Sequence, residues 1–286
     1  MKKNWGIYVA GPMVFWPGGE ELVRCYKELC RKEGFAVPEC ATELEAGDAP
    51  LERACKLRRR CVERLVQSHC VIACVERFRG EEADSGTLFE TGMGMALGHR
   101  IYLYGQMPPA WMGDDVYPDF PTALAACCRD EAAGVNAAAA PDSGPAAHGS
   151  ALLAEVPDGL DFGRAVRWAW KERAGSSLEK LLPKDLRELA DGCRRAIVNL
   201  EDAPGGTEPD SRMAVLCGYL YGKRIPYTAY IKNPVPMVQR IPGAYTDSAG
   251  RMSDVQGNMI EPFGLPLNLM LATTMEGIIS GEGEIR

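Results

Sequence analysis

The chain has 286 residues, of which 46% are hydrophobic and 25% are charged, and these values exclude a disordered or fibrous protein. The net charge of −7 disfavours a general nucleic-acid-binding protein. No run of about 18 apolar residues occurs, so no membrane span is expected. The 11 irregularly spaced cysteines and the start without a signal-peptide pattern indicate free thiols in the cytoplasm.

The first 104 residues alternate between β-prone and helix-prone segments. Strands are expected at 7–10, 35–37, 70–75 and 101–104, and helices at 19–33, 51–68 and 87–97. The apolar run at 70–75 is typical of a strand that is buried on both faces. This alternation predicts an α/β fold in which a parallel sheet carries helices on both faces.

The middle of the chain differs in composition. Residues 129–150 are rich in Ala, Gly, Pro and Ser and are predicted to form a linker or mobile insertion. A helix is expected to open near Asp119, and an amphipathic helix is expected over 162–173.

Beyond residue 183 the alternation resumes, with a helix at 184–191, a strand at 196–200 and a helix at 213–221. The order of elements over Leu65–Tyr104 therefore recurs over Leu189–Tyr230, as in a weak internal repeat. Chance similarity between two such units remains an open alternative.

Ligands of a parallel sheet bind beyond the carboxyl ends of its strands. Tyr8–Phe15 and Phe78–Glu90 are expected to converge there, with Asp84 and Ser85 at the start of a helix. A carboxylate pair such as Asp84 and Glu90 can take two different catalytic roles. One group attacks an anomeric carbon, and the other orients or protonates the leaving group. The alternative is that Asp84 only caps the helix and that Glu90 is a solvated surface acid.

Two further patterns bear on the ligand. The glycines at 92, 94 and 98 do not fit the dinucleotide fingerprint, so a nicotinamide cofactor is not expected. The basic run Arg58–Arg60 is expected to form a solvated helix face, with phosphate binding as the alternative.

Three separated segments carry a resemblance to a known family. They are Ile7–Pro12 with Phe15, Phe78–Glu90 with Gly92 and Gly98, and Phe263–Leu271. In this order they resemble the nucleoside 2-deoxyribosyltransferase family, over roughly residues 5–104 and 255–272. The resemblance implies a flavodoxin/Rossmann-like three-layer sandwich.

The resemblance also implies roles for individual residues. Glu90 would attack C1′ of a 2′-deoxynucleoside and hold a covalent deoxyribosyl intermediate. Asp84 would contact the nucleobase and help to protonate it, and Tyr8 would hold the Glu90 carboxylate. Asn268 would bond the 5′-hydroxyl from a turn that, in the family, usually enters from a neighbouring subunit, so a homo-oligomer is expected.

The resemblance further implies the ligands and the remaining binding residues. The substrates would be 2′-deoxynucleosides and free nucleobases in nucleoside salvage, with neither nucleic acid nor membrane as partner. No metal or cofactor is expected. The substrate-binding residues would be Gly11, Pro12, Phe15, Ser85, Gly86, Asn268 and Met270, with Trp16 as a further candidate for stacking against the base.

The chain departs from the family pattern in its second half. A catalytic unit is expected at 1–128, the linker at 129–150 and a degenerate second unit at 151–286, which includes the Asn268–Met270 turn. Leu216 stands where the first copy has Glu90, and Arg212 replaces Gly86. The second unit is therefore predicted to be catalytically inactive and to supply the Asn268 turn within one chain.

Some assignments stay open at this point. Cys61, Val62 and Glu63 lie near the position where the family has an active-site Asn or Asp, and none of them can be aligned to it. The alternatives to a transferase are an N-glycoside hydrolase of nucleosides or nucleotides and a non-catalytic nucleotide-binding module.

Overall fold

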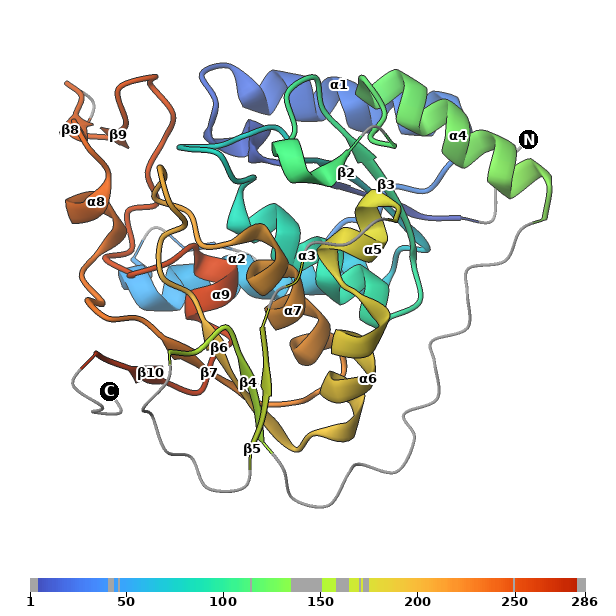
Figure 1. Cartoon of the computed structure of the whole chain (residues 1–286). Coiled ribbons are helices and arrows are strands. Elements are labelled where there is room, and N and C mark those ends of the chain that lie inside the picture. The colour runs from blue at the N-terminus through green and yellow to red at the C-terminus, as the bar shows by residue number, and fades with distance from the viewer. Residues whose placement is uncertain are drawn as a thin grey trace.

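A computed structural model describes residues 5–40, 44–45, 47–113, 115–134, 151–157, 165–169, 171, 175–248 and 250–281. Most of the predicted linker, residues 135–150, lies outside the described part of the chain. The described residues form two parallel β-sheets, one above the other in Figure 1, with helices between them.

The first sheet contains β1 (Ile7–Ala10), β2 (Cys70–Cys74) and β3 (Arg100–Tyr104) in the order β1-β2-β3, and all three strands are parallel. The strand expected at 35–37 is reduced to a single bridge between Gly6 and Ala36. Pro38 follows directly and has no backbone N–H to extend the pairing.

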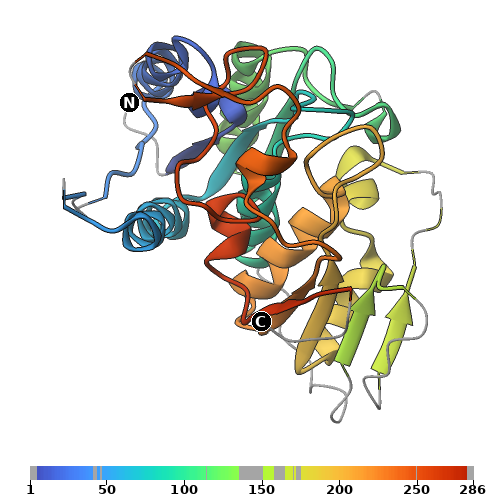
Figure 2. The same cartoon turned by 90° about the vertical axis from the view of Figure 1, so that its left-hand side faces the viewer.

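Helices cover both faces of this sheet (Figures 1 and 2). On one face lie α1 (Gly19–Lys32) and α4 (Phe120–Ala132), and on the other lie α2 (Pro50–Val66) and α3 (Ser85–Ala96). Strand β2 is buried along its whole length, as expected for the centre of such a sandwich. The predicted three-layer α/β arrangement is confirmed for this half.

The second sheet has the order β10-β7-β6-β4-β5, and all its strands are parallel. Its strands are β4 (Ala151–Ala154), β5 (Ala165–Trp168), β6 (Arg195–Asn199), β7 (Tyr227–Tyr230) and β10 (Ile278–Ile279). The helices of this half are α5 (Ser177–Leu181), α6 (Lys184–Gly192) and α7 (Ser211–Gly222).

The prediction of an amphipathic helix over 162–173 is wrong. Residues 165–168 form β5, which pairs in register with β4, as in the partners Leu152 and Val166. Hydrogen bonding to the neighbouring strand outweighs the helical spacing of the apolar residues in such a short segment. Residues 162–164, 170 and 172–174 lie outside the described part.

The remaining elements are short. They are the 3-10 helices η1 (Pro12–Phe15) and η2 (Ala110–Met112), the helices α8 (Met237–Arg240) and α9 (Leu269–Ala272), and the antiparallel pair β8 (Tyr245–Thr246) and β9 (Met252–Ser253). The C-terminal segment returns to the first half, where the backbone N–H of Met259 donates to the carbonyl of Phe15 at 2.7 Å. Within the described residues, every helix is too short or too polar to span a membrane.

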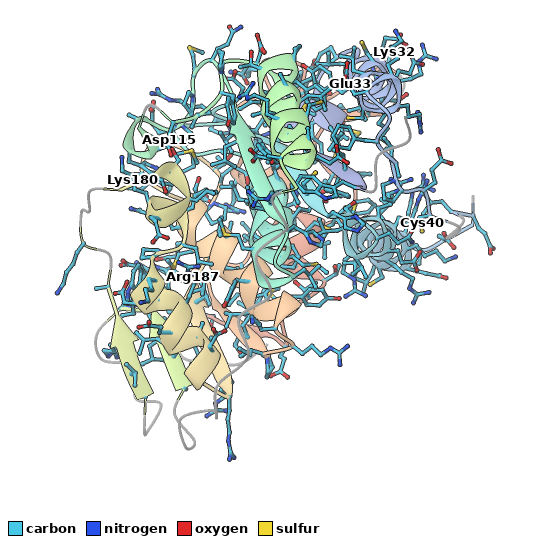
Figure 3. The ribbon with its side chains drawn as sticks, turned by 90° about the vertical axis from the view of Figure 1, so that its right-hand side faces the viewer. Lys32, Glu33, Cys40, Asp115, Lys180 and Arg187 are labelled. Atoms are coloured by element: carbon cyan, nitrogen blue, oxygen red, sulfur yellow. The ribbon has the colours of Figure 1, made fainter. Side chains whose placement is uncertain are left out.

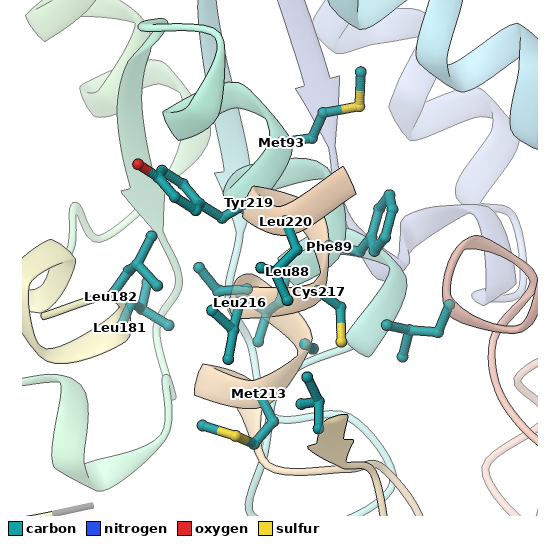
Figure 4. Packing of buried hydrophobic residues seen from close by; sticks show 14 of the residues in the cluster. Leu88, Phe89, Met93, Leu181, Leu182, Met213, Leu216, Cys217, Tyr219 and Leu220 are labelled. Carbon is teal, nitrogen blue, oxygen red and sulfur yellow. The ribbon is translucent and has the colours of Figure 1, made fainter. Parts of the chain in front are cut away.

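The two halves meet where α3 crosses α7. A Cβ atom at Gly92 would lie 1.9 Å from the Val215 carbonyl oxygen, and one at Gly218 would lie 1.8 Å from the Phe89 carbonyl oxygen. The two backbones therefore touch at a point where only glycine fits. Around this crossing, apolar side chains from both helices, among them Leu88 and Leu220, form a shared core (Figure 4).

The helix starts are linked reciprocally. The carboxylate of Glu208 accepts from the backbone N–H of Ser85 at the start of α3, and that of Glu82 accepts from the N–H of Ser211 at the start of α7, each at 3.2 Å. A glutamate of each half thus satisfies a free N–H of the other half's helix.

A second junction lies between η2 and α5. The carboxylate of Asp115 accepts from the Ser177 backbone N–H at 2.8 Å, and Lys180 donates to the Met112 carbonyl at 3.3 Å. Figure 3 shows Asp115 and Lys180 where α5 meets the loop of the first half. The two halves are therefore joined at more than the α3–α7 crossing.

Candidate active site

A cavity of about 610 Å³ lies beyond the carboxyl end of β1. Its wall is made by η1, α1, α2, the start of α3 and the C-terminal segment 259–270. Its volume is typical of a site for a small organic ligand.

Glu90 lies in the second turn of α3 and faces this cavity. The hydroxyl of Tyr8 donates to Glu90 Oε1 at 2.5 Å, and Glu90 is only 8% exposed. The alternative of a solvated surface acid is therefore wrong. Burial raises the pKa of Glu90 to about 7, the Tyr8 hydrogen bond opposes that rise, and the charge of Asp84 adds to it.

Asp84 caps α3 and also lines the cavity. Its Oδ2 accepts from Thr87 N at 2.8 Å and from Thr87 Oγ1 at 2.6 Å. Its Oδ1 is buried and has no hydrogen-bond partner within the described residues. Burial raises the pKa of Asp84, while the bonds from Thr87 lower it. One oxygen of Asp84 thus caps the helix, and the other is not used by any described donor.

The turn at Asn268 reaches the same cavity from the same chain. Asn268 caps α9, since its Oδ1 accepts from the Met270 N–H at 2.9 Å, and both residues line the cavity. A Cβ atom at Gly86 would lie 2.6 Å from Asn268 Nδ2. A glycine at 86 therefore leaves room for the Asn268 side chain against the start of α3.

The other predicted binding residues divide into two groups. Those that line the cavity are Gly11, Phe15, Gly86, Asn268 and Met270. Phe15 also stacks against Phe78, with ring centroids 5.6 Å apart. Pro12, Trp16 and Ser85 are outside the cavity wall; Pro12 is buried in η1, and the Ser85 hydroxyl donates to Glu208 Oε2 at 2.5 Å.

The site holds two further residues: Cys61, which the sequence singled out without a role, and Glu261, which sequence reasoning missed. Cys61 lies beside Tyr8 and Glu90, and burial raises its pKa to about 12, so the thiol stays neutral. Glu261 accepts from the Leu269 N–H at 2.8 Å, and burial raises its pKa to about 8. Glu261 lies two residues before the Phe263–Leu271 segment, and this closeness was the available signal.

Arg79 links the two walls of the site. Its Nε donates to Asp254 at 3.0 Å, a terminal nitrogen donates to the Met259 carbonyl at 2.6 Å, and another lies 3.8 Å from Glu208. The guanidinium also lies over the Phe78 ring, 4.4 Å from its centroid. Arg79 therefore holds the C-terminal segment that carries Glu261 and Asn268 against the loop after β2.

The basic run Arg58–Arg60 is only partly solvated. Arg58 donates to the Thr273 carbonyl at 2.5 Å, Arg59 is exposed, and Arg60 lines the cavity. The expected solvated face is correct for Arg59 alone. Within the described residues, no group of three or more His, Cys, Asp or Glu side chains is arranged to hold a metal ion.

Residues 7–130 match the family model described as nucleoside 2-deoxyribosyltransferase. Over this segment the chain is similar to that family. The match contains Tyr8, Asp84 and Glu90, so the resemblance seen in the sequence is confirmed over the first half of the chain. The second sheet and the Asn268 turn lie beyond the matched residues.

Among solved structures, a 2-desoxiribosyltransferase from Leishmania mexicana is 25% identical to the chain. The alignment covers 44% of this chain and 98% of that one, with a TM-score of 0.35. A search of curated proteins gave no match.

Proposed function

We propose that the chain is a nucleoside 2-deoxyribosyltransferase that transfers 2-deoxyribose between nucleobases through a covalent intermediate on Glu90. The observation that carries the proposal is the 2.5 Å hydrogen bond from Tyr8 to Glu90 inside a cavity that Asp84 also lines. A carboxylate that is held in one orientation beside a sugar-sized space can act as a nucleophile.

In the first step, a Glu90 oxygen forms a bond to C1′ as the C1′–N glycosidic bond breaks. The bonding electron pair stays on the base nitrogen, which takes a proton from Asp84. The transition state resembles an oxocarbenium ion, which the Glu90 carboxylate stabilises. In the second step, a nitrogen of the acceptor base attacks C1′, the bond to Glu90 breaks, and the acceptor nitrogen gives its own proton to Asp84.

The protonation states suit these roles. Glu90 must be ionised to attack, and its pKa of about 7 leaves a substantial ionised fraction at neutral pH. Burial raises the pKa of Asp84, which favours the protonated form that the leaving base requires. The pKa of Tyr8 lies well above its ordinary value because the side chain is buried, so Tyr8 remains a hydrogen-bond donor to Glu90.

We further propose that the chain is divided into a catalytic unit at 1–128, a linker at 129–150 and a degenerate unit at 151–286. In the second unit, Leu216 replaces the nucleophile, and Arg212, which replaces Gly86, forms an ion pair with Asp210. Because the Asn268 turn comes from the same chain, the proposed site needs no second protomer to supply it. We place the activity in cytoplasmic nucleoside salvage.

The proposal is tested by incubating the protein with 2′-deoxyinosine or thymidine, with and without free adenine or cytosine. Products are followed by chromatography, and Glu90→Gln is assayed in parallel. A new deoxynucleoside that requires the acceptor base and is absent with the variant supports the transferase. Free base at the same rate without acceptor indicates the hydrolase instead, and no turnover with any pair contradicts both.

A further inference from the structure

The wall of the cavity formed by α1 and α2 carries three cations. Lys27 comes from α1, and Arg60 and Arg64 come from α2. Arg60 and Arg64 are four residues apart and so lie one above the other on one face of the helix. Leu57 and Cys61 of the same face also line the cavity. This face of α2 therefore belongs to the ligand site.

These three cations have no protein partner. Lys27, Arg60 and Arg64 make no side-chain hydrogen bond or ion pair with any described residue, and the Nε atoms of both arginines are buried without an acceptor. Half-buried positive charges are normally paired, because unpaired ones lose hydration without compensation. This wall of the cavity therefore carries positive charge that no described acid pairs with directly.

Neighbouring cations show the usual pairing. Lys56, one turn before Arg60, lies 2.5 Å from Asp48, and Arg31, one turn after Lys27, lies 3.0 Å from Glu39. Glu20, the acid of α1 that lines the cavity, is exposed. Lys27 and Arg60 therefore differ from these two neighbours in that they face the cavity and have no acid paired to them.

The cations also crowd one another and act on the catalytic groups. Burial and the charges of Arg64 and Arg31 lower the pKa of Lys27. The charge of Arg64 lowers the pKa values of Glu90 and Cys61. The charged wall therefore lies within electrostatic range of the proposed nucleophile.

The cations also lie on the helix beside the Asn268 turn. The guanidinium of Arg58, in α2, donates to the carbonyl of Thr273, directly after α9, at 2.5 Å. The turn that would take the 5′ end of the sugar is thus fixed against the helix that carries Arg60 and Arg64. A neutral nucleoside can offer these cations only uncharged acceptors, whereas a phosphate carries nearly two negative charges and accepts several charge-assisted hydrogen bonds.

We propose that Lys27, Arg60 and Arg64 form a phosphate subsite and that the preferred substrate is a 2′-deoxynucleoside 5′-monophosphate. The inference rests on the proposed glycosyl chemistry at Glu90 and names its substrate class. The phosphate takes no part in bond making; it neutralises the cationic wall and holds the sugar over Glu90.

The test compares kcat/KM for a 2′-deoxynucleoside 5′-monophosphate, its 3′-monophosphate and the unphosphorylated nucleoside, with water or free base as acceptor. The wild-type protein is expected to prefer the 5′-monophosphate at least about tenfold, and Lys27→Gln and Arg60→Gln are each expected to reduce that preference about tenfold. The matched control is Arg59→Gln, because Arg59 is an exposed arginine next to Arg60 on the same helix and is outside the cavity wall.

Binding to the Glu90→Gln variant, measured by calorimetry, separates this inference from the proposed function. Tighter binding of the 5′-monophosphate than of the nucleoside, weakened by adding Arg60→Gln, supports the subsite even if no turnover is found. Turnover of the nucleoside with no preference for the 5′-monophosphate overturns the subsite and leaves the proposed function in place. Equal preference for the 3′-monophosphate overturns the 5′ assignment, and absence of both turnover and binding overturns both.

Discussion

Helices α3 and α7 are built alike at their starts and differ in what they do. Each begins after an aspartate whose side chain accepts a backbone N–H of its own first turn, Asp84 in α3 and Asp210 in α7. Each then carries a glycine at the crossing, Gly92 or Gly218. The shared features are those that the fold requires, namely a cap and a close backbone contact.

The differences lie at the positions that face the cavity in α3. Glu90 corresponds to Leu216, which is fully buried, and Gly86 corresponds to Arg212, which pairs with Asp210. Tyr8, which pairs with Val71 in the first sheet, has Leu152 at the equivalent strand position, opposite Ala196. The second half therefore folds without the Glu90 carboxylate and its Tyr8 donor. Folding alone does not explain why the first half has them.

The largest effect is expected for Glu90→Gln, which removes the nucleophile and keeps the shape. The rate of deoxyribosyl transfer should fall by at least about 10³-fold, because an amide cannot form the glycosyl ester. The measurement is kcat by chromatographic assay. Leu216→Met, a volume-conserving change at the equivalent position of α7, is the control and should leave kcat within about threefold. More than a tenth of wild-type activity in Glu90→Gln would contradict the assignment of the nucleophile.

The crossing of the two helices can be broken from either side. Gly92→Ala and Gly218→Ala should each lower the free energy of unfolding by about 3 kcal/mol, since each added methyl group would lie within 2 Å of a carbonyl oxygen of the other helix. Denaturant unfolding measures both. Gly47→Ala is the control, because a Cβ atom there meets nothing within 4 Å. Stability losses that differ widely between the two variants would show that the crossing is not symmetric.

The sequence was sufficient for the parts of this comparison that are encoded locally. The fully buried strand β2 and the Asp84 cap have clear local patterns, and the resemblance correctly brought Tyr8, Asp84 and Glu90 into one cavity. The resemblance also placed Asn268 at the same cavity from the distant C-terminal segment.

Other features depend on tertiary contacts, which no local pattern reports. The apolar spacing around Trp168 predicts a helix, but pairing with β4 makes the segment a strand. Lys27 and Arg60 lie on separate helices, and their shared cavity follows only from how α1 and α2 pack around β1. The sequence showed Arg79 only as one residue of a motif and did not predict its contacts, because its partners are about 130 or more residues away in the sequence.

A smaller effect on activity is expected for Tyr8→Phe, which makes position 8 apolar, as Leu152 is at the equivalent position of the second sheet. Loss of a hydrogen bond to a charged group costs about 1.5–3 kcal/mol, so kcat/KM at pH 7 should fall about 10- to 100-fold. The Tyr8 bond lowers the pKa of Glu90, so its removal raises that pKa above about 7 and reduces the ionised fraction. The acidic limb of the pH–rate profile should therefore move to higher pH; an unmoved limb would show that Tyr8 does not act through Glu90.

The smallest effects are expected at the reciprocal glutamates. Burial raises the pKa of Glu208 to about 7, from an ordinary value near 4.5. A raised pKa in the folded state means that stability is fully present below pH 4.5 and is lost as the pH rises through 7. Glu208→Gln does not titrate and can still accept from Ser85, so its Tm relative to wild type should rise between pH 5 and pH 8. Glu82 also accepts from Ser211 N at 3.2 Å, but its side chain is only half-buried. Glu82→Gln should therefore change the free energy of unfolding by less than about 1 kcal/mol at either pH. A Tm difference for Glu208→Gln that stays flat or falls over this range would mean that Glu208 is ionised throughout and that the two helix starts are held in the same way.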